Sequence, residues 1–300
     1  DARNYTARGK LLWPPTQMLD LLFSADYSDL ECDCTALAVR DIKASPQQQA
    51  LLEEQLPLVP SDKLQDVNND QRNFSNIDAS GYSVTVDWDI GDCTLTSISA
   101  YRDWNSEGIV DLDRGPNRVL GLSFPDPPRT EQEQVSQELR LSSVPRDWGN
   151  FVVGLYYFDQ QYESGNTTSA QLAPFLPATS RVTQTDVDSE NLAVFGEVSL
   201  NVFERWQLTL GGRYTEDELD FRTVAVGTDN LVFGPEGTVG DSVTESDFSP
   251  KVTLQWDMTD DAMTYLSYAE GYKGPAFDTA VLAGGSFADP EQSTSRELGF

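Results

Sequence analysis

Carboxylates and thiols are the side chains of this chain that could act in catalysis or bind a metal ion. Acidic residues gather at 29–33, 111–113 and 215–218. Such groups of oxygen ligands can hold a divalent cation, and a pair of carboxylates about 5–9 Å apart can hydrolyse a glycosidic bond. Acidic stretches are more often solvated loop surface. Nothing in the sequence fixes a carboxylate pair on rigid neighbouring strands facing a cleft, so we expect no catalytic residue and no metal site.

The cysteines and the missing histidine narrow the chemistry further. Cys32 and Cys34 lie close together, Cys93 lies far from both, and the chain contains no histidine. An odd cysteine count cannot complete a disulfide framework, and one Cys-x-Cys pair lacks the second pair that a metal site needs. A disulfide between Cys32 and Cys34 would be local and strained. Without histidine, Ser-His-Asp, Cys-His and His-metal chemistry are excluded. We therefore expect neither an enzyme nor a bound cofactor.

Composition excludes several partners. The formal net charge of -29 leaves no basic surface for nonspecific nucleic-acid binding or for docking on anionic lipid headgroups. No apolar run approaches the roughly 18 residues that a spanning helix needs. The mean hydropathy of -0.42 is typical of a soluble protein. A membrane β-barrel has a similar average, because only alternate strand residues meet lipid.

The sequence pattern predicts that most of these side chains lie on or between β-strands. Apolar residues alternate with polar ones, as in Trp206, Leu208 and Leu210 against Gln207 and Thr209. Each apolar face covers about 9–11 residues, the length of a tilted strand that crosses hydrocarbon. We predict eleven strands, at 6–13, 18–27, 80–89, 93–104, 132–143, 150–161, 189–201, 206–219, 246–257, 262–272 and 294–300.

Tryptophans mark the short connections between these strands. The turns at 14–17, 89–92, 145–150, 202–205 and 258–261 are each accompanied by an indole, whereas Trp104 lies away from them. Indole rings prefer the membrane–water boundary, so this pattern is typical of a β-barrel in a bilayer. We predict a periplasmic aromatic girdle formed by Trp13, Trp88, Trp148, Trp206 and Trp256.

The remaining connections are long and acidic. They run over about 28–79, 105–131, 160–188, 220–245 and 273–293, and the first should carry a helix that Ser45 caps and Pro57 ends. Soluble sandwiches and propellers also contain alternating strands. Their loops are not divided into short and long ends, and a propeller blade has four strands where each unit here has two.

Charged residues of both signs should face the inside of the barrel. They are Glu138, Arg140, Glu197, Arg213, Lys251 and Asp257. Such residues could line water in a porin or contact a folded plug, and the alternation favours neither. The sequence geometry alone therefore predicts a large barrel with a polar interior.

Eight segments, in order along nearly the whole chain, resemble the barrel of TonB-dependent outer-membrane receptors. They are ARGKLLWPPT at 7–16 with LLFSADY at 21–27, LTSISAYR at 95–102, SQELRL at 136–141, VGLYYF at 153–158, LGGRY at 210–214, FSPKV at 248–252, YLSYAEGYKG at 265–274 and SRELGF at 295–300. Each motif alone is modest, but the ordered set is specific.

The resemblance implies an all-β, transmembrane, antiparallel up-and-down barrel with short periplasmic turns and long extracellular loops. About 11 of an expected 22 or so strands fall within residues 1–300. We expect this segment to be one barrel domain, a fragment of a longer chain that lacks the N-terminal plug and the C-terminal strands. It should lie in the outer membrane of a Gram-negative bacterium.

The implied function is active import of a scarce ligand, most often a ferric siderophore in this family, energised by TonB through the missing plug. Outer-membrane lipid and lipopolysaccharide are the other expected partners, the latter through metal ions that join acidic loops to its phosphates; no nucleic acid is expected. Two alternatives remain, namely a passive porin-like channel and a soluble extracellular β-protein used for binding.

Overall fold

The protein is an eleven-stranded antiparallel sheet in which chain order and spatial order coincide. The computed structural model describes residues 2–33, 38, 61–63, 66–67, 69, 71–111, 121–171, 177–227, 236–277 and 287–300. The strands of this sheet are β1 (Ala2–Thr16), β2 (Leu19–Cys32), β3 (Phe74–Ile90), β4 (Cys93–Ile109), β5 (Gly121–Ser143), β6 (Gly149–Gln171), β7 (Thr179–Phe203), β8 (Trp206–Gly227), β9 (Gly237–Thr259), β10 (Ala262–Lys273) and β13 (Glu291–Gly299). All eleven predicted strands and the up-and-down topology are therefore confirmed.

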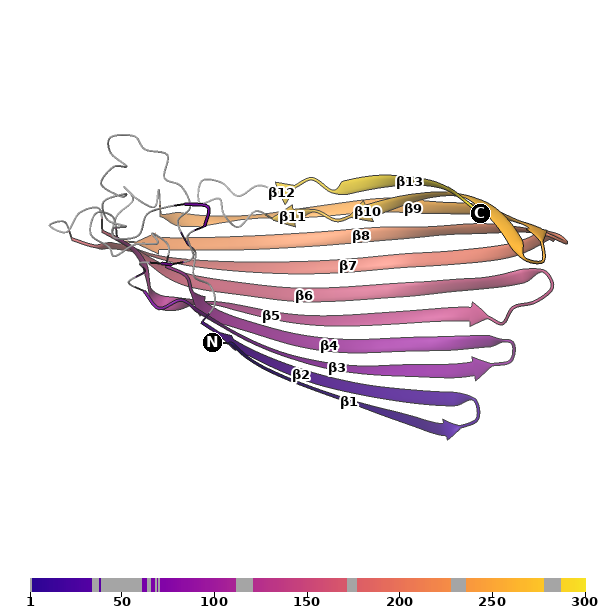
Figure 1. Ribbon diagram of the computed structural model, residues 1–300, viewed down its shortest axis with the longest axis horizontal. Helices are drawn as coiled ribbons and strands as arrows, with labels where there is room; N and C mark the ends of the chain where they lie inside the picture. The colour runs from indigo at the N-terminus through magenta and orange to yellow at the C-terminus, as the bar shows by residue number, and fades with distance from the viewer. Residues whose placement is uncertain are drawn as a thin grey trace.

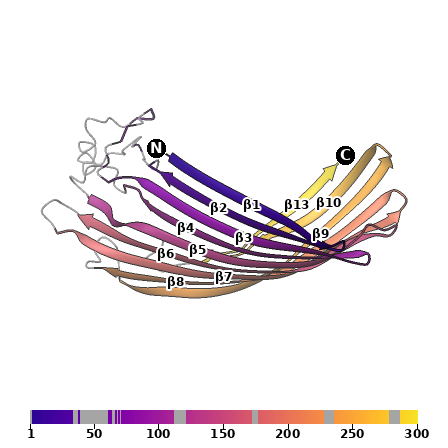
Figure 2. The same ribbon diagram turned by 90° about the horizontal axis from the view of Figure 1, so that it is seen from below.

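The sheet is curved into a trough whose two ends differ (Figure 1, Figure 2). Five tight hairpin turns join β1 to β2, β3 to β4, β5 to β6, β7 to β8 and β9 to β10, and they gather at one end. Two further short strands, β11 (Ala276–Phe277) and β12 (Phe287–Ala288), pair with each other toward the opposite end. No helix among the residues described here has the length and apolar character needed to cross a membrane.

The convex face of the sheet is apolar. Leu155, Val194, Tyr214 and Phe248 form one register row across β6 to β9, and their exposed fractions are 51%, 54%, 48% and 60%. Large apolar side chains left open to this extent indicate a surface that meets lipid.

The concave face is more crowded and more polar. Ala193, Thr215, Leu219 and Phe221 lie on it, and each is at most 7% exposed. Side chains converge on the inner side of a curved sheet and diverge on its outer side. The alternation predicted from sequence therefore becomes a lipid-facing convex surface and a partly buried concave wall.

The strands are longer than predicted, mainly at the end away from the tight turns. For example, β5 begins at Gly121 and β7 begins at Thr179, so the predicted loops 105–131 and 160–188 are largely strand. Apolar alternation marks only the part of a strand that crosses lipid, whereas backbone pairing continues beyond it. The register of β5 shifts around Pro125, Pro127 and Pro128, which cannot donate to the ladder. The predicted helix at 45–56 lies outside the described residues.

Beyond the apolar band the convex face becomes acidic. Asp29, Asp78, Glu131, Glu163 and Asp186 belong to one register row that crosses β2 to β7. This row lies on the side of the band opposite the tight turns. The change from apolar to charged surface indicates where the strands leave hydrocarbon.

Candidate functional site: the polar concave wall

The concave wall is the part of the sheet that a passing or bound molecule would meet. All six charged residues predicted to face inward lie on it. Register rows show this directly, since Arg140 aligns with Gly154, Phe195 and Arg213, while Glu197 aligns with Gly211 and Lys251. The prediction of a polar interior with both charge signs is therefore confirmed in geometry.

Two ion pairs on the wall reach across an intervening strand. The Arg102 Nη2 atom lies 2.9 Å from Asp26 Oδ2, over Gly81 of β3, and Lys251 Nζ lies 2.8 Å from Glu197 Oε2, over Gly211 of β8. A Cβ atom on residue 81 would lie 2.9 Å from Arg102 Nη2, so any larger residue there would push the guanidinium away from this position. Each pair is partly exposed, so its contribution to stability is about 1 kcal/mol or less. Their main effect is to fix side-chain positions across three strands.

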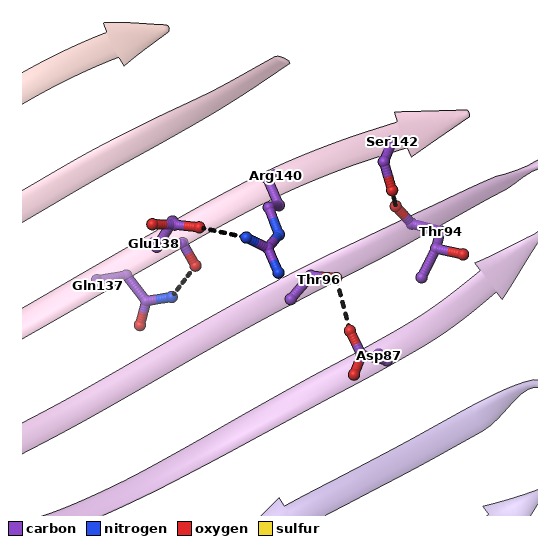
Figure 3. A network of polar contacts seen from close by, with 7 residues as sticks. All are labelled: Asp87, Thr94, Thr96, Gln137, Glu138, Arg140 and Ser142. Atoms are coloured by element: carbon purple, nitrogen blue, oxygen red, sulfur yellow. Dashed lines mark hydrogen bonds and ion pairs between the residues drawn. The ribbon is translucent and has the colours of Figure 1, made fainter. Parts of the chain in front are cut away.

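A hydrogen-bonded network covers the wall near the tight-turn end of β3 to β5 (Figure 3). Thr96 Oγ1 donates to Asp87 Oδ1 at 2.6 Å, and Arg140 Nη1 donates to Glu138 Oε1 at 3.3 Å. Thr96 is only 5% exposed. Because the buried hydroxyl is satisfied by a carboxylate, this part of the wall is a fixed polar surface.

Arg213 is placed differently from the paired cations. Its guanidinium carbon lies 5.3 Å from the ring centre of Tyr156 and 5.9 Å from that of Phe195, and Nε donates to Thr215 Oγ1 at 3.0 Å. No carboxylate in the described part of the chain lies within 4.0 Å of it. Two aromatic rings therefore hold this cation, with cation–π attraction in place of an ion pair.

A connecting segment folds over the wall at the end away from the tight turns. Phe221 of β8 stacks on Phe277 of β11 with ring centres 3.5 Å apart, and it meets the edge of Phe287 of β12 at 5.3 Å. Nearby, Gln292 Nε2 donates to Asp247 Oδ1 at 2.8 Å. We call the pair β11 and β12 with these contacts the aromatic clasp. The clasp covers part of the concave wall near the end of the sheet that lies away from the tight turns.

The structure places the five predicted girdle tryptophans at the tight-turn end of the sheet. Trp206 and Trp256 are register partners with ring centres 5.3 Å apart, while Trp13, Trp88 and Trp148 are each about half exposed. Trp104 lies on β4, level in register with Ala79 and Gln132, far from those turns. The depth of these indoles in a membrane stays a prediction.

The acidic stretches and the cysteines do not form a chemical centre in the described residues. Glu216 and Glu218 point to the convex face whereas Asp217 points to the concave face, because strand neighbours alternate. No group of three or more possible metal ligands occurs among the residues that the structure describes. Cys93 is a free thiol and Cys32 is disulfide-bonded, while Cys34 lies outside the described residues.

Sequence patterns did not identify Arg8, Asp26 and Arg102 as neighbours. Asp26 and Arg102 are 76 residues apart in the chain, and they meet only through the register of three strands. A slip of one residue in either pairing would move one of them to the other face. The alternation of residues along each strand assigns all three side chains to the same face of the sheet. It does not show which of them are neighbours across the strands.

A curved antiparallel sheet with an apolar convex face, a polar concave face and short turns at one end is the wall of an outer-membrane β-barrel. Residues 41–300 match the family described as TonB dependent receptor-like, beta-barrel, and the chain belongs to this family. The chain is thus part of a barrel of the Gram-negative outer membrane, and its family consists of transporters and not enzymes.

Solved structures with the same fold include three receptors whose names refer to a siderophore or a ferric complex. The ferric yersiniabactin uptake receptor FyuA from Yersinia pestis has a TM-score of 0.74 and 16% identity over 99% of this chain and 42% of its own. The siderophore receptor PiuA from Acinetobacter baumannii has a TM-score of 0.71 and 14% identity, over 99% and 47%. The ferric-catecholate import receptor Fiu from E. coli K12 has a TM-score of 0.65 and 11% identity, over 99% and 48%. The chain spans less than half the length of each.

Proposed function

We propose that the protein carrying this chain imports a ferric siderophore across the outer membrane, with energy supplied by TonB. Residues 1–300 are then one part of its barrel domain, and a plug and further strands are supplied by sequence outside this segment. Membership of the receptor family is the observation that carries the proposal. Three structures of similar fold are named as siderophore or ferric-complex receptors, which supports the choice of cargo.

Features of the concave wall favour an active importer over a passive channel. The cross-strand ion pairs and the ring-held Arg213 form a preorganised surface, suited to contact with a folded occupant. The aromatic clasp covers part of the passage that a porin would keep open. Both features agree with a barrel that is filled and gated.

The test is uptake of radioactive iron by a strain that lacks the complete gene, restored by the gene on a plasmid. Cells are offered a panel of ferric siderophores with cobalamin and oligosaccharides as alternative cargo. We expect uptake of at least one ferric siderophore, and its loss when tonB is deleted. Uptake that persists without tonB would indicate a passive channel. Recovery of the full-length product in the aqueous fraction without detergent would contradict any barrel function.

A further inference from the structure

A notch of about 210 Å³ opens on the concave wall where β1 to β5 run side by side. Arg8, Asp26, Gly81 and Arg102 are consecutive partners in one register row, and all four line the notch. Its remaining lining includes short hydroxyl side chains, namely Ser24, Ser83 and Ser136. Small residues at the base and long basic residues at the rim give a recess that is open to the interior.

The charge of this notch is opposite to that of the chain. Its lining holds two arginines and one carboxylate, so its formal charge is +1 (two minus one), in a chain of net charge -29. Lys10, two residues from Arg8, shares the same face of β1. Arg102 is held on Asp26 at 2.9 Å, whereas Arg8 forms no ion pair with the described part of the chain. One guanidinium is therefore fixed in position and the other remains available.

The notch also holds an unused hydrogen-bond donor. The Ser24 hydroxyl oxygen is buried and has no hydrogen-bond partner among the described residues. A buried polar group left unsatisfied is costly, so a ligand that accepts this hydrogen would be favoured. Ser24 precedes Asp26 by two residues and shares its face of β2, which puts the hydroxyl beside the two arginines.

We propose that this notch binds a carboxylate group of a ligand that passes along the wall. The inference rests on the proposed import function. Arg8 would supply the planar fork that matches a carboxylate, Ser24 would donate a further hydrogen bond, and Asp26 would hold Arg102 in place. The volume suits one carboxylate with a few neighbouring atoms, so the notch contacts an outer group of the ligand and not its whole body. Cargo with ionised carboxylates at its periphery is the class selected.

The experiment measures citrate binding to the complete receptor, purified in detergent, by calorimetry and by the shift in unfolding temperature. Triethyl citrate, which has the same skeleton without charge, is the matched probe. The test variant is Arg8→Gln, which breaks no ion pair within the described chain. The control is Arg222→Gln, which removes the same charge from the convex face of β8. We expect Arg8→Gln to weaken citrate binding about ten-fold, as for loss of one charge-assisted contact. Arg222→Gln should bind citrate like the wild type.

The outcomes show whether a ligand or the protein itself supplies the carboxylate. They also distinguish failure of this proposal from failure of the proposed import function. If wild-type receptor binds no citrate and Arg8→Gln unfolds at a lower temperature than Arg222→Gln, the notch holds a carboxylate of the protein's own, and the proposal of a ligand site is overturned. Equal citrate binding by wild type and Arg8→Gln overturns the proposal, as does equal binding of triethyl citrate. Absence of both citrate binding and any stability difference also overturns it. Citrate binding without siderophore uptake would refute the proposed cargo and leave the notch intact.

Discussion

Gly81 shows how one missing side chain allows two others to meet. The Asp26–Arg102 pair passes directly over it, and a Cβ there would lie 2.9 Å from Arg102 Nη2 and 3.2 Å from Asp26 Oδ1. We predict that Gly81→Val separates the pair. The measurement is a double-mutant cycle with Asp26→Asn, using unfolding of the receptor in detergent. Asp26→Asn should cost up to about 1 kcal/mol in the wild type and close to nothing in the Gly81→Val background.

A matched glycine controls for the general effect of valine on a strand. Gly9 of β1 has nothing within 4 Å of its ideal Cβ position. Gly9→Val should therefore leave the cost of Asp26→Asn unchanged. If the cost is also unchanged in Gly81→Val, the pair does not depend on the glycine, and the crossing geometry is wrong.

The membrane depth of individual tryptophan positions can be used to test the orientation of the sheet. We propose that Trp13, Trp88, Trp148, Trp206 and Trp256 lie at the periplasmic membrane boundary, because all five are at the tight-turn end. In a background with Cys93→Ser, a spin label at each position should report interfacial depth by its accessibility to oxygen and to a water-soluble relaxant. A label at Trp104, on the concave face, should show no lipid exposure. Equal lipid exposure at 104 and 88 would contradict the assignment of faces.

At the scale of elements, the aromatic clasp is the contact that holds β11 and β12 to the wall. Phe221 is 5% exposed and packs on both Phe277 and Phe287. We predict that Phe221→Ala frees the clasp without unfolding the sheet, because the backbone ladder of β8 is unaffected. Hydrogen exchange at 276–277 and 287–288 should increase by about ten-fold or more, as for loss of one to two buried ring contacts.

Phe248→Ala is the control for this prediction, since Phe248 lies on the convex face and is 60% exposed. It should leave exchange in the clasp unchanged. If Phe221→Ala alters neither strand of the clasp, the ring contacts are not what secures it. If exchange rises throughout β8, the residue supports the sheet as a whole.

Some strand segments could be predicted from the sequence, whereas others could not. The period of two in residues 206–215 defines both the strand and its lipid face, because one face must be apolar in a bilayer. The outer part of β7, from Thr179, has polar residues on both faces, so no periodic signal marks it. The clasp and the notch depend on contacts between distant strands, and register is not encoded in any single strand. Faces were therefore predictable, whereas partners across the wall were not.

At the scale of the whole molecule, the outermost strands of the sheet matter most. Within the described residues, β1 pairs only with β2 and β13 pairs only with β10, so each has one open edge. Hydrocarbon offers no hydrogen bonds to the N–H and C=O groups of an open edge, and each unsatisfied group costs several kcal/mol. We therefore predict that residues 1–300 expressed alone aggregate, whereas the complete receptor inserts into liposomes. Folded barrels of this kind resist detergent until heated, so gel mobility before and after boiling measures the outcome. A heat-modifiable band from residues 1–300 alone would show that the two edges are closed by pairing between copies, and cross-linking between positions on β1 and β13 would then identify that contact.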